Sequence, residues 1–298
     1  IFTPFGQERL GSRRWLQIGF LPSLQPSEFA KIAMILFVAS YHKHDRSAQR
    51  PLKRFGPQIA IGSLITILIF LQRDYSSALL FFALCLAMLI ASGFRISYLF
   101  ILIGFLTPLA LIAMLIQPYR VKRIFSFLFP SLDPSGMSYQ VSTSLKAIRS
   151  GGLFGVGLGK GTYKLGLLPE VQSDFIFASI CEELGFTGAL FIIILFCMFA
   201  ILGYNAAKRI ANSDRFLSFT AFGLTSMIIF QAVLNLAVVT GLLPPTGIPL
   251  PFFSQGGTNI FVVLIGCSLI YRILLINSGR IRFIKREDDE TDTIRRGS

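Results

Sequence analysis

Seven apolar segments constrain the fold of this chain more than any other feature. A helix that crosses a membrane needs about 20 mostly apolar residues. Lys, Arg, Asp and Glu make up 14% of the chain, against about 25% in a typical soluble domain, so a soluble enzyme is excluded. We expect an all-α polytopic membrane protein with about seven transmembrane helices. The apolar segments cover residues 25–42, 57–72, 76–92, 98–117, 186–204, 217–240 and 258–277.

Lys and Arg residues gather in alternate connections between these segments, at 43–54, 95, 208–215 and 280–286. Basic residues favour the cytoplasmic side of a membrane, so we place these connections there. The net charge of +13 then reflects basic flanks, and we expect no nucleic-acid partner. Residues 1–277 are predicted to form a single transmembrane domain with a large extracellular loop at 118–185. Residues 278–298 form a charged cytoplasmic tail.

The predicted outer face also carries many cations, among them Arg14, Arg120 and Arg123. Long loops are largely exempt from the charge rule, so these residues need no special explanation. The sharper alternative is an anionic substrate that is handled outside the membrane.

Glu28 and Lys31 lie three residues apart at the start of the first apolar segment. On a helix they share a face and can pair. They are either first-turn charges near the membrane interface or a buried pair. Ionisable residues inside a membrane are usually functional, which favours the second interpretation.

Asp174 precedes an apolar run that begins at Phe175. A carboxylate in apolar surroundings can act as a general base near neutral pH. Asp is equally common as the residue that caps a helix N-terminus. The local sequence leaves both roles open, and Glu182 and Glu183 could simply form an interfacial turn.

Two glycine-containing segments stand out. The run from Gly151 to Gly161 lacks the spacing of a P-loop and the βαβ context of a dinucleotide site, so we expect a packed re-entrant or interfacial segment. Gly256 and Gly257 follow a proline-rich loop and precede the last apolar segment. The N–H groups of that helix start could hold a phosphate, or the glycines could form only an entry turn.

Together these motifs resemble the SEDS family, which includes FtsW and RodA, and the closing motif around Asn277 is slightly more similar to FtsW. The resemblance covers almost the whole chain. Family members have ten transmembrane helices, which implies three upstream of Ile1, in agreement with the predicted sidedness. The motifs include Gly11–Trp15, Gln25–Lys31, Tyr119–Arg123, Gly151–Gly155, Leu168–Glu170, Asp174–Ala178, Pro245–Phe252 and Gly256–Gly257.

The resemblance implies a peptidoglycan glycosyltransferase in the bacterial cytoplasmic membrane. It would polymerise lipid II at the outer face with a class B penicillin-binding protein, in a division or elongation complex. Asp174 matches the essential acidic residue of the family. A lipid II flippase is the alternative, and a division scaffold would need no Asp174.

Polymerisation releases a polyprenyl diphosphate, which needs cations or a divalent metal. The candidate cations are Arg14, Lys31, Arg120 and Arg123. The expected substrate site also includes Glu28, the partner of Lys31, and the helix start at Gly256 and Gly257. If a metal takes part, we expect Mg²⁺ or Mn²⁺, because only oxygen ligands are available on that face.

Overall fold

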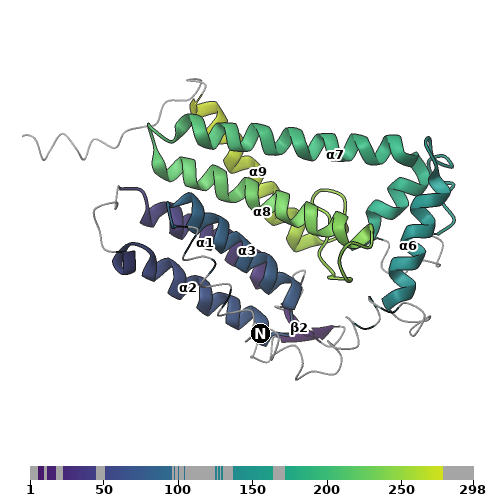
Figure 1. Ribbon diagram of the computed structural model, residues 1–298, viewed down its shortest axis with the longest axis horizontal. Coiled ribbons are helices and arrows are strands. Elements are labelled where there is room, and N and C mark those ends of the chain that lie inside the picture. Colours follow the sequence, from purple (N-terminus) through teal and green to yellow (C-terminus); the bar gives the residue numbers. More distant parts are fainter. Residues whose placement is uncertain are drawn as a thin grey trace, which may run out of the picture.

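The computed structural model describes residues 6–9, 12–17, 23–44, 51–95, 137–163 and 172–277, with residues 97, 100, 104, 125, 127 and 129. Most of these residues are helical (Figure 1). The elements are β1 (Gly6–Arg9), β2 (Ser12–Leu16), α1 (Pro26–Tyr41), α2 (Pro51–Leu71), α3 (Tyr75–Ala91), α6 (Met137–Gly151), α7 (Ile176–Ile210), α8 (Arg215–Val239) and α9 (Gly257–Asn277).

Six of the described helices coincide with apolar segments, which confirms the predicted helical membrane fold; α6 lies within the predicted loop at 118–185, and α7 begins ten residues before its segment. Four helices in the described part are long and apolar enough to cross a membrane: α2, α7, α8 and α9. The total of seven spans stays a prediction, because most of segment 98–117 lies outside the described residues, as do Arg120, Arg123 and the tail at 278–298. The antiparallel hairpin β1–β2 is an addition that the apolar pattern did not indicate.

Helix α8 lies between α7 on one side and α1 and α3 on the other (Figure 1). Small residues allow the close approach. A side chain at Gly203 of α7 would overlap Thr225 of α8, and one at Gly223 would overlap Ile35 of α1. The core around α8 is therefore tightly packed and includes the buried side chains of Ile35, Leu224 and Ile228.

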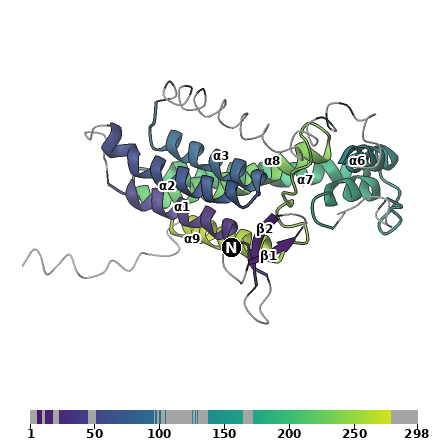
Figure 2. The same ribbon diagram turned by 90° about the horizontal axis from the view of Figure 1, so that it is seen from below.

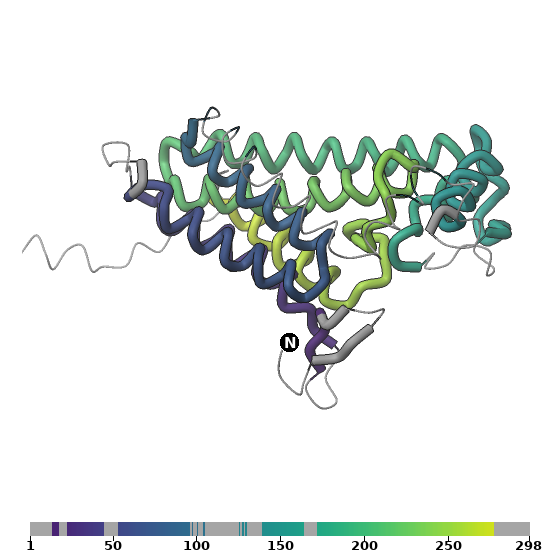
Figure 3. Tube along the Cα trace, turned by 60° about the horizontal axis from the view of Figure 1, so that its bottom comes forward, coloured from purple at the N-terminus to yellow at the C-terminus, as the bar shows by residue number. Residues whose placement is uncertain are grey.

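The connections group at two ends of the bundle, as the charge pattern predicts. At one end, the Tyr41 hydroxyl donates to Lys53 O (2.6 Å), and Arg54 Nη2 donates to Ser92 O (2.7 Å). At the other end, the segment before α1 contacts the starts of α3 and α9, and β2 packs beside α1 (Figure 3). The membrane side of each end stays a prediction.

Candidate functional site

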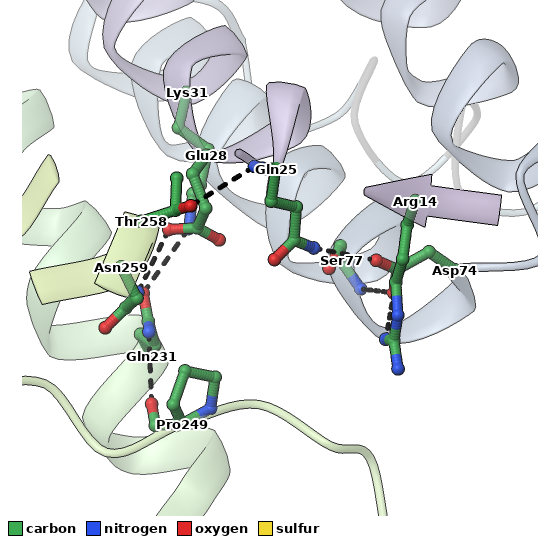
Figure 4. A network of polar contacts seen from close by, with 10 residues as sticks. All are labelled: Arg14, Gln25, Glu28, Lys31, Asp74, Ser77, Gln231, Pro249, Thr258 and Asn259. Carbon is green, nitrogen blue, oxygen red and sulfur yellow. Dashed lines mark hydrogen bonds and ion pairs between the residues drawn. The ribbon is translucent and has the colours of Figure 1, made fainter. Parts of the chain in front are cut away.

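Asp74 organises the end of the bundle where the hairpin lies. Its Oδ1 accepts a hydrogen bond from Ser77 N (3.2 Å) and so caps α3, and it lies 3.5 Å from Nη1 of Arg14. Its Oδ2 accepts from Gln25 Nε2 (3.1 Å) (Figure 4). One buried carboxylate thus joins the hairpin, the approach to α1 and the start of α3.

Glu28 and Lys31 form a buried ion pair at this same end of α1. Lys31 Nζ lies 2.8 Å from Glu28 Oε1, and the two residues are only 3% and 5% exposed. Asn259 Nδ2 of α9 donates to the other Glu28 oxygen (3.0 Å), and Lys31 Nζ also donates to Gln231 Oε1 of α8 (3.4 Å) (Figure 4). The structure confirms the buried pair, in place of exposed first-turn charges, and shows that it ties three helices together.

Two amides on α8 hold the proline-rich loop at residues 244–251, and one of them, Gln231, also contacts the ion pair. Gln231 Nε2 donates to Pro249 O (3.0 Å), and Asn235, one turn further along α8, donates to Ile248 O (2.8 Å). The same Asn235 Nδ2 donates to the backbone oxygen of Asp174 (2.8 Å). Because these donors sit on a buried helix face, they fix both the loop and the backbone at Asp174.

Asp174 lies in the turn before α7, half-buried, and its side chain faces the proline-rich loop. A Cβ atom on Gly247 would lie 3.3 Å from Asp174 Oδ2. Gly247 has a φ of 73°, a left-handed conformation that glycine adopts without strain. The residue that occupies the N-cap position of α7 is Phe175, not Asp174. The structure therefore places the carboxylate one residue before the cap, against a glycine.

The start of α9 lies beside the same segment. Gln255 N donates to Gln172 O (2.8 Å), two residues before Asp174. Helix α9 begins at Gly257, and apart from its chain neighbours and its own helix backbone, no described atom lies within 4 Å of the position that a Cβ on Gly257 would take. A helix N-terminus carries partial positive charge and free N–H groups. An open helix start thus adjoins the segment that carries the carboxylate.

The predicted site residues fall into three groups. Asp174 lies on a segment that adjoins Gly256 and Gly257 through the hydrogen bond from Gln255 to Gln172, and Glu28 and Lys31 are linked to Asp174 only through α8. Arg14 lies next to Asp74, and Arg120 and Arg123 lie outside the described residues. Sequence analysis missed Asp74, Gln231, Asn235 and Asn259. A signal existed for two of them, because Gln231 and Asn235 are four residues apart within an apolar segment and therefore share a helix face.

Glu182 and Glu183 hold the glycine-rich segment 151–163 on the first turns of α7. The Glu182 carboxylate accepts from the N–H of Thr162 (2.6 Å) and from its hydroxyl (3.1 Å), and Glu183 Oε2 accepts from Gly159 N (2.9 Å). Gly151, Gly155 and Gly185 pack backbone against backbone, with no room for a Cβ. The segment is packed, as predicted, and the two acids belong to α7 and not to a separate turn.

The described residues do not form a complete metal-binding site, so a bound metal would also need ligands from the substrate. The described residues contain no group of three or more His, Cys, Asp and Glu side chains that could hold an ion. Glu28 and Asp74 are engaged with cations and amides. Mg²⁺ often binds through one or two carboxylates plus substrate phosphates, so the metal stays a prediction.

Comparisons with known proteins agree with this architecture. A family model described as "Cell cycle protein", which covers FtsW, RodA and SpoVE, matches residues 1–278. The probable peptidoglycan glycosyltransferase FtsW of Borreliella burgdorferi is 42% identical over 264 residues, or 88% of this chain and 72% of that protein. Stage V sporulation protein E of Bacillus subtilis is 38% identical over 270 residues, or 90% of this chain and 73% of that protein.

Solved structures share the fold. A chain of a peptidoglycan synthase complex, described in terms of coordinated polymerization and crosslinking, matches with a TM-score of 0.74 and 25% identity over 94% of this chain and 77% of that chain. RodA of Thermus thermophilus matches with a TM-score of 0.62 and 24% identity, over 94% of this chain and 73% of that chain. The chain therefore belongs to the SEDS family of FtsW, RodA and SpoVE, and it is a polytopic membrane protein.

Proposed function

We propose that this protein is a peptidoglycan glycosyltransferase that polymerises lipid II. One observation carries the proposal: the Asp174 carboxylate and the open start of α9 lie on adjoining segments at one end of the bundle, joined by the Gln172–Gln255 hydrogen bond. A base and an anion-binding helix start are what the transfer of a sugar from a diphosphate carrier requires. The names of the related FtsW proteins support the same activity.

Asp174 is the proposed general base. The attacking hydroxyl of the acceptor sugar gives its proton to the Asp174 carboxylate as its oxygen bonds to the anomeric carbon of the donor. The bond between that carbon and the diphosphate oxygen breaks, and the polyprenyl diphosphate leaves with the electron pair. A positioned base of this kind contributes typically about 10²–10⁴-fold in rate.

The leaving diphosphate would be stabilised by the N–H groups at Gly256 and Gly257 and by cations of the outer face. Arg14 remains a candidate because it is only partly buried beside Asp74. Lys31 is less available, since its charge is compensated by Glu28 within the bundle. Its proposed contribution is to hold Gln231, and through it the proline-rich loop, in place. A Mg²⁺ or Mn²⁺ ion held by the substrate phosphates would add to this stabilisation.

The partner proposed for this polymerase is a class B penicillin-binding protein, which would cross-link the product. The match to a chain of a peptidoglycan synthase complex supports this pairing. The proposed location is the bacterial cytoplasmic membrane, with the Asp174 end facing outward. The extracellular side follows from the basic residues at the opposite end of the bundle, at Lys43, Lys53 and Lys208.

A flippase would need a membrane with two compartments, and this requirement separates it from a polymerase. The full-length protein and its partner synthase, purified in detergent, are supplied with labelled lipid II. A polymerase makes glycan chains that resolve as a ladder on a gel. A preparation that is folded and binds lipid II but makes no chains would contradict the proposed function.

A further inference from the structure

Apolar side chains project from the turn that follows α6. Leu153 is 66% exposed, Phe154 is 80% exposed and Leu158 is 75% exposed. Lys160, two residues further on, is exposed as well. We define Gly152–Leu158 as the apolar turn. Nothing in the proposed chemistry requires large apolar groups to project from this segment.

The apolar turn is held firmly, so the exposure of its side chains is built into the fold. Val156 N and Gly157 N donate to the backbone oxygens of Glu182 and Glu183 (3.0 Å each). In return, Phe186 N donates to Gly152 O (2.9 Å) and Thr187 N donates to Leu153 O (3.1 Å). These bonds satisfy backbone groups of α7 around the kink at Gly185, where φ is 68°, and lock the turn onto it.

The length of α7 gives the depth of the turn in a membrane. Lys208 and Arg209 are exposed in the last turn of α7 and mark one boundary. A hydrocarbon core of about 30 Å needs about 20 residues at 1.5 Å each, so the opposite boundary falls close to Gly188. Phe186 and Thr187, which bind the apolar turn, lie just beyond that point. Figures 1 and 2 place α6 at this same end of α7.

The apolar turn also adjoins an exposed apolar surface of α7. Phe186, Leu190, Phe191 and Ile194 are large, apolar and exposed along the helix that adjoins the turn. Aromatic and aliphatic groups with a neighbouring Lys are typical of segments that lie in the headgroup region. We propose that the apolar turn is a membrane-interface anchor, which inserts Phe154 and Leu158 into the outer boundary of the bilayer and fixes the height of the extracellular segment above it.

Depth-dependent fluorescence quenching tests this anchor without reference to activity. The chain contains one Trp, so the wild-type protein supplies the baseline. Phe154→Trp is reconstituted, without a partner, in nanodiscs whose lipids carry bromine either high or low on the acyl chain. Lys146→Trp is the matched control, because Lys146 is exposed on the neighbouring helix α6 and its charge marks it as facing water.

We expect the emission that Phe154→Trp adds to be blue-shifted and quenched at least about twofold more by shallow than by deep bromines, as suits insertion of about 5–10 Å. Lys146→Trp should be quenched by neither lipid. Added emission from Phe154→Trp that is red-shifted and unquenched, like that of the control, would overturn the anchor. Emission that shifts to the blue only when a class B synthase is added would also overturn it, in favour of a protein contact.

Discussion

Helices α7 and α8 pack side by side, and both are strongly apolar, yet their surroundings differ completely. Most of the α8 surface is buried, and it carries the buried polar side chains of Thr225, Ser226, Gln231 and Asn235. Most of α7 beyond Gly185 is exposed, and its exposed side chains are large and apolar, such as Phe191 and Met198. Hydropathy alone identifies both as spans. The distribution of polar residues within each span shows which one lies inside the bundle.

This difference has a functional meaning. Polar groups inside a membrane protein are costly unless they are paired. Of the buried polar groups of α8, Gln231 and Asn235 pair with the segments that form the proposed site. The exposed face of α7 has no such partners to satisfy and suits contact with lipid. Changes on α8 and on the elements that it holds should therefore damage folding and activity, whereas changes on the outer face of α7 should not.

The largest effect on stability is expected at the ion pair that α8 contacts through Gln231. Lys31→Ala leaves Glu28 buried without its cation, which should cost about 3–5 kcal/mol. The double variant Glu28→Ala/Lys31→Ala removes both charges and should recover much of that stability but less of the activity. Chemical denaturation in detergent and the polymerisation assay measure the two quantities. A fully active double variant would show that the pair is only structural.

A smaller loss of stability is expected for a change at the contact between α7 and α8. Gly203→Ala places a methyl group against Thr225, and overpacking of this kind costs about 1–3 kcal/mol. Leu202→Ala is the matched change one residue away, on an exposed position of α7. The thermal unfolding midpoint should fall clearly for the glycine variant and hardly at all for the control. Equal shifts would remove the distinction between the two faces of α7.

Asn235→Leu tests the link from α8 to Asp174. The change leaves the backbone oxygens of Asp174 and Ile248 without their donor, at a cost of about 1–2 kcal/mol. Activity should fall more than this loss of stability explains, because the carboxylate is no longer held against Gly247. Val233→Ala, at an exposed position of the same helix, should leave both unfolding and polymerisation near wild type. Unchanged activity in folded Asn235→Leu would mean that α8 does not position the site.

The smallest effect on stability is expected in the turn before α3, outside α7 and α8. Arg73 has a φ of 62° in the turn before α3, a conformation that costs non-glycine residues about 1–2 kcal/mol. Arg73→Gly removes this strain but gains chain entropy on unfolding, so a net gain of about 0.5 kcal/mol is expected. Gly93, with a φ of 85°, gives the reverse test: Gly93→Ala should destabilise the protein. A loss of stability in Arg73→Gly would show that the Arg side chain matters more than the backbone strain.

The sequence predicts the local features of this fold well. The apolar segments locate six of the described helices, and the spacing of Glu28 and Lys31 predicts their pairing, because both follow from the geometry of one helix. The residues that complete their surroundings come from distant segments. Asn259 lies 231 residues from Glu28 in sequence, and no local pattern connects the two.

In the candidate site, too, the sequence indicates the local motifs but not the contacts between distant segments. Asp174 and the glycines of α9 stand out in the sequence as motifs, but their adjacency depends on the hydrogen bond from Gln255 to Gln172 and on the donors of α8. Asp74 was a further omission, because its role arises from contacts with Arg14 and Gln25 in other elements. Such contacts are consequences of helix packing, which a single sequence does not specify.

The polymerisation rate of Asp174→Asn tests the central claim most directly. Asn keeps the size and the hydrogen-bonding ability of the side chain, but it cannot take up the proton. With labelled lipid II and the partner synthase, we expect normal folding and lipid II binding and a rate at least ~100-fold lower than wild type. Asp174→Glu should also be slow, because a displacement of about 1 Å can cost ~10²-fold. A folded Asp174→Asn protein that polymerises at half the wild-type rate or more would contradict the assignment of Asp174 as the general base.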